Sequence, residues 1–231
     1  MPAPRELTQF WSTSGFADKR RFEETARRWI RLPEAGEGPL DHLLPEAVWQ
    51  ELLAEVDDQA GWLMALSAAT GVYFFPSREW PPLFIRYLRL LKVRRLLEAG
   101  AGRGYLSAAL APLAEAAGIK FKAVDKGEGE FQHSLPVYAG VEPGNVFAVV
   151  HEFQPDAVLY AWPPPGQTLA SLLQSRSLRY LIVIGEKDGG AAGAREDWRI
   201  LNHKPSFALN CCGRGRTGPE PHQVTVFYRP R

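Results

Sequence analysis

The chain has 231 residues, of which 45% are hydrophobic and 23% charged, which is typical of a globular protein with an ordinary core. Its 27 basic and 26 acidic residues give a net charge of +1, so no overall field draws it to nucleic acid or an anionic membrane. The start of the sequence has no apolar signal-peptide core, and no run reaches the roughly 18 apolar residues of a membrane span. The adjacent Cys211 and Cys212 favour buried thiols over a disulfide or a metal site. We therefore expect a cytoplasmic protein with no metal.

The first 90 or so residues have the periodicity of helices. Residues 17–32 predict an amphipathic helix, 45–70 one or two helices, and 83–92 another. The arginines of the first helix are interpreted as a solvated face rather than a phosphate-binding stripe: Arg20, Arg21, Arg27, Arg28 and Arg31. We expect residues 1–75 to form a helical extension or cap and residues 76–231 a second unit.

From about residue 93, apolar runs alternate with helical segments, which predicts an α/β protein with a doubly wound, mostly parallel sheet. The last two β runs are separated by turn formers and predict a C-terminal antiparallel hairpin. The predicted strands, seven in all, cover residues 93–100, 119–126, 134–140, 156–162, 179–186, 207–212 and 223–230.

The first of these strands ends in a glycine loop, Glu98-Ala99-Gly100-Ala101-Gly102-Arg103-Gly104, and Tyr105 opens a helix. Glycines let the backbone turn sharply and approach a ligand, while the helix N-terminus presents free N–H groups. Asp125 closes the next strand, 21 positions after Gly104. A carboxylate there can accept both hydroxyls of a ribose, or it caps the following turn. The pattern favours a nucleoside-binding loop.

The spacing inside the loop distinguishes between nucleoside cofactors. Its G-x-G-x-G differs from the G-x-G-x-x-G fingerprint of dinucleotide sites. A charged Glu98 beside the loop would repel a pyrophosphate and would suit a ligand that carries an ammonium group. Both features favour S-adenosylmethionine over NAD.

Three stretches carry a resemblance to a known family. LLEAGAGRGYLSAAL, FKAVDK and DAVLYAWPPPG resemble the first, second and fourth motifs of class I S-adenosylmethionine-dependent methyltransferases, over roughly residues 75–231. FPSRE, AWPPPG and VFYRP are further similar to a poorly characterised methyltransferase-like group with Trp-Pro-Pro at the fourth motif. The resemblance implies a Rossmann-like methyltransferase fold and S-adenosylmethionine as cofactor.

The resemblance also implies roles for individual residues. Gly100, Gly102 and Gly104 would wrap the methionine part of the cofactor, and Glu98 would approach its ammonium. Asp125 would hold the ribose hydroxyls. Tyr138 would lie by the adenine, and Trp162 and Pro163 beside the methyl group.

The fourth motif departs from the amine-methylating relatives, in which Asn or Asp precedes two prolines. Trp162 stands there, and an indole N–H only donates hydrogen bonds. Pro165 replaces the aromatic that stacks on a target base, so we expect a small-molecule substrate rather than nucleic acid. Trp162 either offers its ring face to a substrate or packs in the core. Pro163, Pro164 and Pro165 either form a rigid rim with bare carbonyls or only end the strand.

Glu186, at the end of a strong strand, and Trp162 are the candidate catalytic residues, with His133 in a loop as a weaker candidate base. Ser77 or Glu79 reaches the cofactor or substrate, or Ser77 instead caps the helix that begins near Trp80. Residues 189–197 either form a loop over the site or are an ordinary connector. Two other functions stay open: a non-catalytic cofactor-binding or interaction module, and a nucleotide-dependent oxidoreductase, which the loop spacing disfavours.

Overall fold

The computed structural model describes residues 19–34, 36–127, 140–186, 192–210 and 222–229. Its helices are α2 (Lys19–Trp29), α3 (Glu46–Ala54), α4 (Gln59–Thr70), α5 (Trp80–Leu90), α6 (Tyr105–Ala116), α7 (Val146–Phe153), α8 (Ala170–Leu173), α9 (Arg195–Ile200) and α10 (Phe207–Asn210). Its strands are β1 (Arg95–Ala99), β2 (Lys120–Asp125), β3 (Val141–Pro143), β4 (Ala157–Ala161), β5 (Tyr180–Gly185), β6 (His203–Pro205) and β7 (Gln223–Tyr228).

The strands form one seven-stranded sheet in the order β3-β2-β1-β4-β5-β7-β6. Strands β1 to β5 are parallel to one another, whereas β7 lies antiparallel between β5 and β6. The order reverses between β1 and β4, the place where open α/β sheets bind ligands at the carboxyl ends of their strands. The predicted doubly wound, mostly parallel sheet is confirmed.

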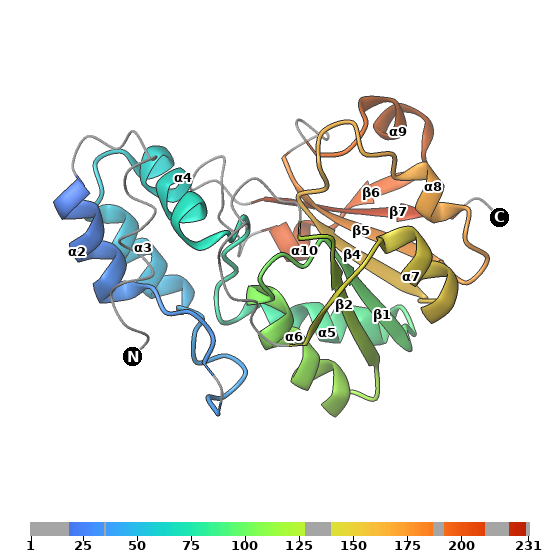
Figure 1. Ribbon diagram of the computed structural model, residues 1–231, viewed down its shortest axis with the longest axis horizontal. Helices are drawn as coiled ribbons and strands as arrows, with labels where there is room; N and C mark the ends of the chain where they lie inside the picture. Colours follow the sequence, from blue (N-terminus) through green and yellow to red (C-terminus); the bar gives the residue numbers. More distant parts are fainter. Residues whose placement is uncertain (1–18, 35, 128–139, 187–191, 211–221, 230–231) are drawn as a thin grey trace.

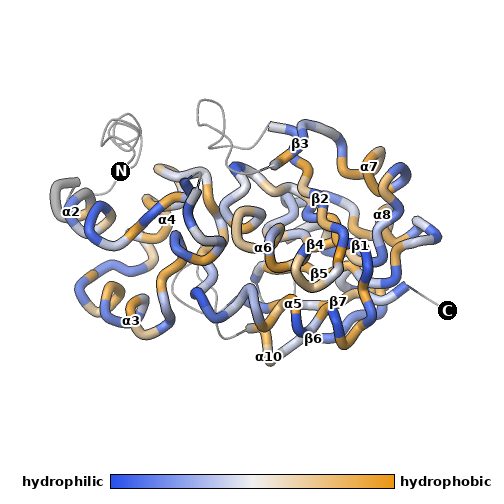
Figure 2. Tube along the Cα trace, turned by 90° about the horizontal axis from the view of Figure 1, so that it is seen from below, coloured by the Kyte–Doolittle hydropathy of each residue, from blue (hydrophilic) through white to orange (hydrophobic). Residues whose placement is uncertain are grey.

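Helices cover both faces of the sheet (Figure 1). On one face α5, α6 and α10 bury residues such as Phe84, Leu110 and Leu209 against β4 and β5. On the other face α7 and α8 bury Val150 and Leu172. The helices carry hydrophobic and hydrophilic residues in alternation, as helices with one buried side do (Figure 2).

The N-terminal helices α2, α3 and α4 form a lobe beside the sheet (Figure 1). Its core contains Phe22, Trp49 and Trp62, and it extends onto α6 through Tyr105 and Ala109. The predicted helical character is confirmed, and residues 45–70 form two helices rather than one. Three arginines of this stretch are exposed, namely Arg27, Arg28 and Arg31, and their interpretation as a solvated face rather than a phosphate-binding stripe stays a prediction.

The predicted antiparallel C-terminal strand pair is confirmed, but its first strand is β6 and not residues 207–212. Residues 207–210 form the short helix α10, and β7 pairs instead with β6. The Ser206 N–H donates to the Val224 carbonyl at 2.7 Å just after β6 ends, and Leu209 turns inward to the core at 3% exposure. The Trp80 indole donates to the Leu209 carbonyl at 2.9 Å, which fixes this turn against α5. Cys211 and Cys212 lie outside the described residues.

Two other predictions also need correction. The third strand, predicted over 134–140, is observed at Val141–Pro143, and residues 134–139 lie outside the described part of the chain. The loop predicted over 189–197 gives way to helix α9 from Arg195. Buried Asp197 accepts from the backbone N–H groups of Leu169 and Ala170, so this helix holds the start of α8.

Residues 78 and 79, just before α5, form hydrogen bonds with the N-terminal lobe. The Arg78 guanidinium donates to the Leu43 carbonyl at 3.0 Å, and Glu79 accepts from the Glu46 N–H at 3.1 Å. Glu79 therefore supports the N-terminus of α3. The predicted cap by Ser77 is wrong, because residue 79 occupies the N-cap position of α5 and the Ser77 side chain is fully buried.

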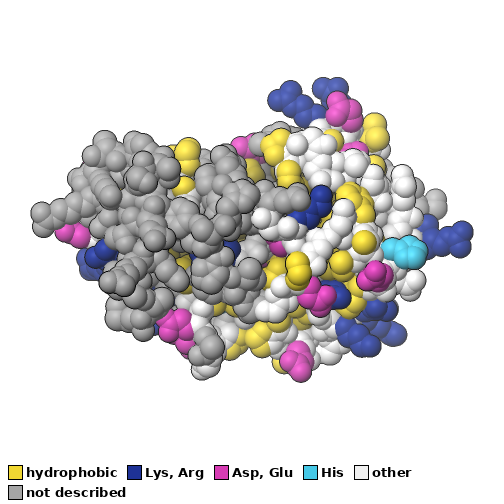
Figure 3. Space-filling model, viewed as in Figure 1, with side chains coloured by type: hydrophobic (Ala, Val, Ile, Leu, Met, Phe, Trp, Pro, Cys, Tyr) yellow, Lys and Arg dark blue, Asp and Glu magenta, His cyan; other side chains and the backbone are white. Residues whose placement is uncertain are grey.

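Acidic and basic side chains both occur on the described surface of the sheet domain, in keeping with the small net charge (Figure 3). Within the described residues, no helix has the length and apolar character needed to cross a membrane.

Asp156 joins three strands at the amino edge of the sheet. Its Oδ2 accepts from the N–H groups of Arg94 and Arg95 at 2.6 and 3.0 Å, and its carbonyl accepts from Arg179 N–H at 2.9 Å. We predict that Asp156→Ala lowers the free energy of unfolding by about 1–3 kcal/mol, since two N–H groups lose a charged acceptor. Urea unfolding measures this, with the exposed Glu152→Ala as the control. Equal midpoints for the two variants would contradict the role of Asp156.

Candidate functional site

The glycine loop lies between β1 and α6. Gly100, Gly102 and Gly104 have φ values of 62°, 57° and 83°, a region that other residues rarely adopt. The Ala101 N–H donates to the Val124 carbonyl at 3.1 Å, which joins the loop to the end of β2. Gly104 is the N-cap of α6 and carries no capping side chain, so the loop presents backbone groups at the start of a helix.

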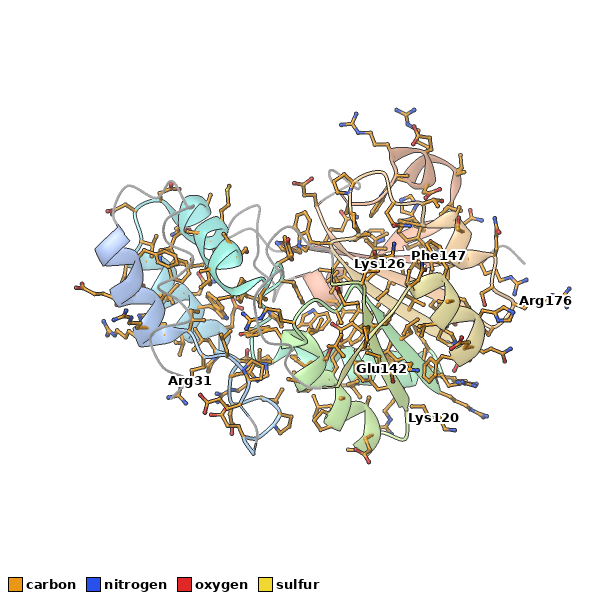
Figure 4. The ribbon with its side chains drawn as sticks, in the orientation of Figure 1. Arg31, Lys120, Lys126, Glu142, Phe147 and Arg176 are labelled. Carbon is orange, nitrogen blue, oxygen red and sulfur yellow. The ribbon has the colours of Figure 1, made fainter. Side chains whose placement is uncertain are left out.

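Asp125 binds the loop directly. Its Oδ2 accepts from Gly102 N–H at 2.8 Å, and its Oδ1 accepts from Gly127 N–H at 2.6 Å. The structure therefore brings together the loop and the carboxylate that the sequence pairs by spacing. Asp125 also caps the turn after β2, as the alternative interpretation held. Two carboxylate oxygens offer about four lone-pair directions, so both can still accept from a ligand. Lys126, just past Asp125, marks this carboxyl end of β2, and Lys120 marks the amino end (Figure 4).

Glu98 lies beneath the loop at 3% exposure and accepts from the Ser107 hydroxyl at 2.7 Å. Burial raises the pKa of Glu98 to about 8; the hydrogen bond from Ser107 opposes this and the nearby Asp125 adds to it. At neutral pH this carboxyl group is therefore mostly protonated. A cationic ligand beside the loop would favour the ionised form of Glu98 and lower its pKa.

Tyr160 on β4 is a site residue that the sequence analysis missed. A Cβ on Gly100 would come within 2.7 Å of the Tyr160 ring, so the two residues are in close contact. Tyr160 is 6% exposed, and burial followed by the charge of Asp125 raises its pKa to about 12. The phenol is therefore neutral and lies within the electrostatic reach of Asp125. Its place in the strand, directly opposite Ala99, is the signal that could have found it.

Trp162 follows β4 in a strained conformation. Its φ of 53° is unusual for a bulky residue and costs on the order of 1–3 kcal/mol. Two hydrogen bonds hold it: Trp162 N–H donates to the Ile184 carbonyl at 2.8 Å, and the indole N–H donates to His222 Nδ1 at 3.2 Å. The ring is only partly buried and packs against the core around Phe74. Trp162 thus packs in part against the core, whereas a contact of its ring face with a substrate stays a prediction. His222 joins the site as a residue not foreseen from the sequence.

The prolines form a rim that the backbone ties to the segment before α9. Pro163 carbonyl accepts from Gly193 N–H at 3.0 Å, Gly166 N–H donates to Gly193 carbonyl at 3.1 Å, and Ala194 N–H donates to Gln167 carbonyl at 2.9 Å. The expectation of bare carbonyls is wrong for Pro163, and also for Pro164, whose carbonyl accepts from Gln167 N–H at 3.0 Å. The rigid rim itself is present.

A cleft of about 680 Å³ opens beside this rim, at the carboxyl ends of β4 and β5. Pro165 and Gly166 form one side, Glu186 lies at the end of β5, and residues 193–196 at the start of α9 complete it. Glu186 is therefore next to the prolines, on a different strand from the glycine loop.

Some predicted residues are not placed. Tyr138 and His133 lie outside the described residues, so their predicted roles stay predictions. Among the residues that the structure describes, no three His, Cys, Asp or Glu side chains gather as a metal site would require.

The chain is similar to several solved structures. No protein-family model and no curated protein matches it. Human N-acetylserotonin methyltransferase in complex with S-adenosylmethionine is 9% identical, with a TM-score of 0.46, over 100% of this chain and 72% of that chain. Cofactor-bound Rv0187 from MTB is 14% identical, with a TM-score of 0.42 and full coverage of both chains. A methyltransferase from Archaeoglobus fulgidus is 14% identical, with a TM-score of 0.36, over 64% of this chain and 94% of that chain. These likenesses assign no residue of this chain a role.

The raised pKa of Glu98 predicts a dependence of stability on pH. The folded protein keeps the Glu98 proton up to pH about 8, whereas the unfolded chain releases it near 4.5. The contribution of this proton to the free energy of unfolding is therefore lost as pH rises from 4.5 to about 8. We predict that Glu98→Gln, which can still accept from Ser107, gains stability relative to the parent chain across this window. Chemical unfolding at pH 5, 7 and about 8.5 measures the difference.

The exposed Glu152→Gln is the control for loss of a surface carboxylate. A difference between Glu98→Gln and the parent that stays constant with pH would show that Glu98 is already ionised.

Proposed function

We propose that the protein is an S-adenosylmethionine-dependent methyltransferase that acts on a small molecule. The observation that carries the proposal is the hydrogen bond from Gly102 N–H to Asp125 Oδ2, which joins a three-glycine loop to the acidic end of the next strand. This pair stands where the order of the strands reverses. The residues around it are the ones that the methyltransferase motifs pair.

The residues present fit this cofactor. The loop offers backbone groups, without side chains, at Gly100, Gly102 and Gly104, and Asp125 has free lone pairs for ribose hydroxyls. Glu98, buried and protonated in the free protein, would ionise in response to a cationic ligand. A pyrophosphate would offer Glu98 no such compensation, so the site favours the sulfonium cofactor over a dinucleotide. When bound, S-adenosylmethionine supplies an activated methyl group, so the protein mainly positions the acceptor.

The cleft beside the prolines is proposed as the acceptor site. Trp162 directly follows β4 and precedes the prolines of the rim, and its ring is partly exposed. The Glu186 carboxylate would take the proton that an acceptor hydroxyl or amine loses. Because the indole N–H of Trp162 already donates to His222, Trp162 serves as an apolar wall and not as a proton acceptor.

The same engagement of Trp162 favours a second candidate: a module that binds the cofactor without methyl transfer. The position that carries the polar acceptor in amine-methylating relatives is occupied here by a donor bonded within the protein. Turnover separates the two candidates.

Calorimetric titration with S-adenosylmethionine, S-adenosylhomocysteine and NAD tests the cofactor. We predict binding of the two sulfur compounds and not of NAD. We predict at least a roughly ten-fold loss of affinity in Gly102→Val, which strains the loop, and in Asp125→Ala, which removes its charged acceptor.

Two matched variants serve as controls. Gly118→Val imposes the same backbone strain at φ 71°, at the far end of α6 with open space around it. Glu142→Ala removes a carboxylate from neighbouring β3. Equal affinity of the site variants and their controls would disprove this cofactor site.

Turnover tests the reaction. We predict methyl transfer from labelled S-adenosylmethionine to members of a panel of small phenols, amines and carboxylic acids. In Glu186→Gln we predict a fall in kcat of roughly a hundred-fold, a usual size for loss of a general base, with unchanged affinity for the cofactor. The exposed Glu196→Gln, on the same cleft, is the control. Cofactor binding without transfer to any panel member would favour the non-catalytic module.

A further inference from the structure

Two side chains of the glycine loop region contact the N-terminal lobe. Arg103, between Gly102 and Gly104, is 3% exposed, and its Nη1 donates to the Thr70 carbonyl at 2.8 Å. Tyr105, directly after Gly104, is also 3% exposed and lies in the hydrophobic core of the lobe. The loop thus presents glycine backbone toward its ligand position and anchors itself through the residues on either side of Gly104.

The Arg103 contact is electrostatically matched. Thr70 is the last residue of α4, and Gly71 ends the helix with a φ of 68°. A helix C-terminus carries partial negative charge on its last carbonyls, and a cation stabilises it there. Thr70 is fully buried, so its carbonyl depends on a hydrogen-bond partner within the protein. Removal of the guanidinium would leave a buried carbonyl without a hydrogen bond, which lowers the stability of the folded protein.

A second pair of contacts joins α6 to the loop before α3. The Nε2–H of His42 donates to the Tyr105 carbonyl at 3.0 Å, and the Tyr105 hydroxyl donates to the His42 carbonyl at 3.4 Å. The two rings meet edge to face at 4.8 Å, and Phe75 packs on Tyr105 at 5.5 Å. His42 is 2% exposed, and burial lowers its pKa, so its ring is neutral. Both ends of the Gly104 turn are thus held by the lobe.

We infer that the N-terminal lobe is a positioning element of the cofactor loop and that Arg103 is the residue through which it acts. The inference rests on the proposed function in that the ligand is taken to be S-adenosylmethionine or its product. The loop contributes its glycine backbone to the site, and the lobe sets where that backbone lies. By thermodynamic reciprocity, a ligand that orders the loop also stabilises the contact between the loop and α4.

The test compares Arg103→Met, Arg103→Lys and the parent in the full chain. Met keeps the length and removes the charge, whereas Lys keeps a charged donor for the Thr70 carbonyl. We expect the affinity for S-adenosylhomocysteine to fall roughly ten-fold or more in Arg103→Met and to be largely restored in Arg103→Lys. Arg28→Met is the control, since Arg28 makes an exposed ion pair with Glu55 at 3.6 Å within the lobe.

Hydrogen exchange supplies a readout that a merely structural role would not change. In the parent, S-adenosylhomocysteine should slow exchange in residues 66–72, at the end of α4, and in Arg103→Met this protection should disappear. Unchanged affinity in Arg103→Met, or residues 66–72 that do not respond to ligand in the parent, would overturn the inference.

The outcomes keep the two proposals apart. If the parent binds neither sulfur compound, the proposed function fails, and the inference is decided by exchange of residues 100–106 without ligand. Faster exchange there in Arg103→Met than in Arg28→Met supports the inference, and equal exchange overturns it. If Arg103→Met does not fold, His42→Leu, which removes the hydrogen bond to Tyr105, takes its place in both measurements.

Discussion

The hydrogen bond between Gly102 N–H and Asp125 Oδ2 holds a segment that has little other reason to keep its shape. Three glycines with positive φ lose more conformational freedom on folding than other residues would, and they have no side chains to pack. The loop therefore depends on fixed partners. Asp125 provides one from the sheet, and Thr70 provides another from the lobe through Arg103. These two attachments act together with the hydrogen bonds of Ala101 to Val124 and of His42 to Tyr105.

Much of the sheet could be predicted from the sequence because its central strands are buried on both faces. The runs at β4 and β5 are almost continuously apolar, which is typical of parallel strands that are buried on both faces. At residues 207–210 the local sequence pattern predicts the wrong element. Their apolar composition suits a strand, yet Leu209 and the indole of Trp80, 129 positions away, fix a helical turn. A contact across that separation leaves no trace in a local pattern.

In the candidate site too, some features follow from local sequence patterns and others depend on contacts between distant residues. The glycines and Asp125 follow from spacing along two adjacent strands, which is a local property of a βαβ unit. The protonation of Glu98 does not, because it depends on how completely α6 and the loop bury the carboxyl group. Tyr160 and His222 were missed because their partners, Gly100 and Trp162, lie 60 positions away along the chain. The strained turn at Trp162 likewise exists only where the carbonyl of Ile184 and the ring of His222 meet it.

The rim of the cleft has a consequence for how such a protein can diverge. Its closing hydrogen bonds run between backbone groups of residues 163–167 and 193–194, and no side chain takes part in them. The side chains that line the cleft, among them Glu186 and Glu196, are therefore separate from the bonds that shape it. Substitutions at those positions can alter the charge and size of the cleft while the rim persists. Related proteins with this rim could therefore differ in the ligands that the cleft binds with little change in folding stability.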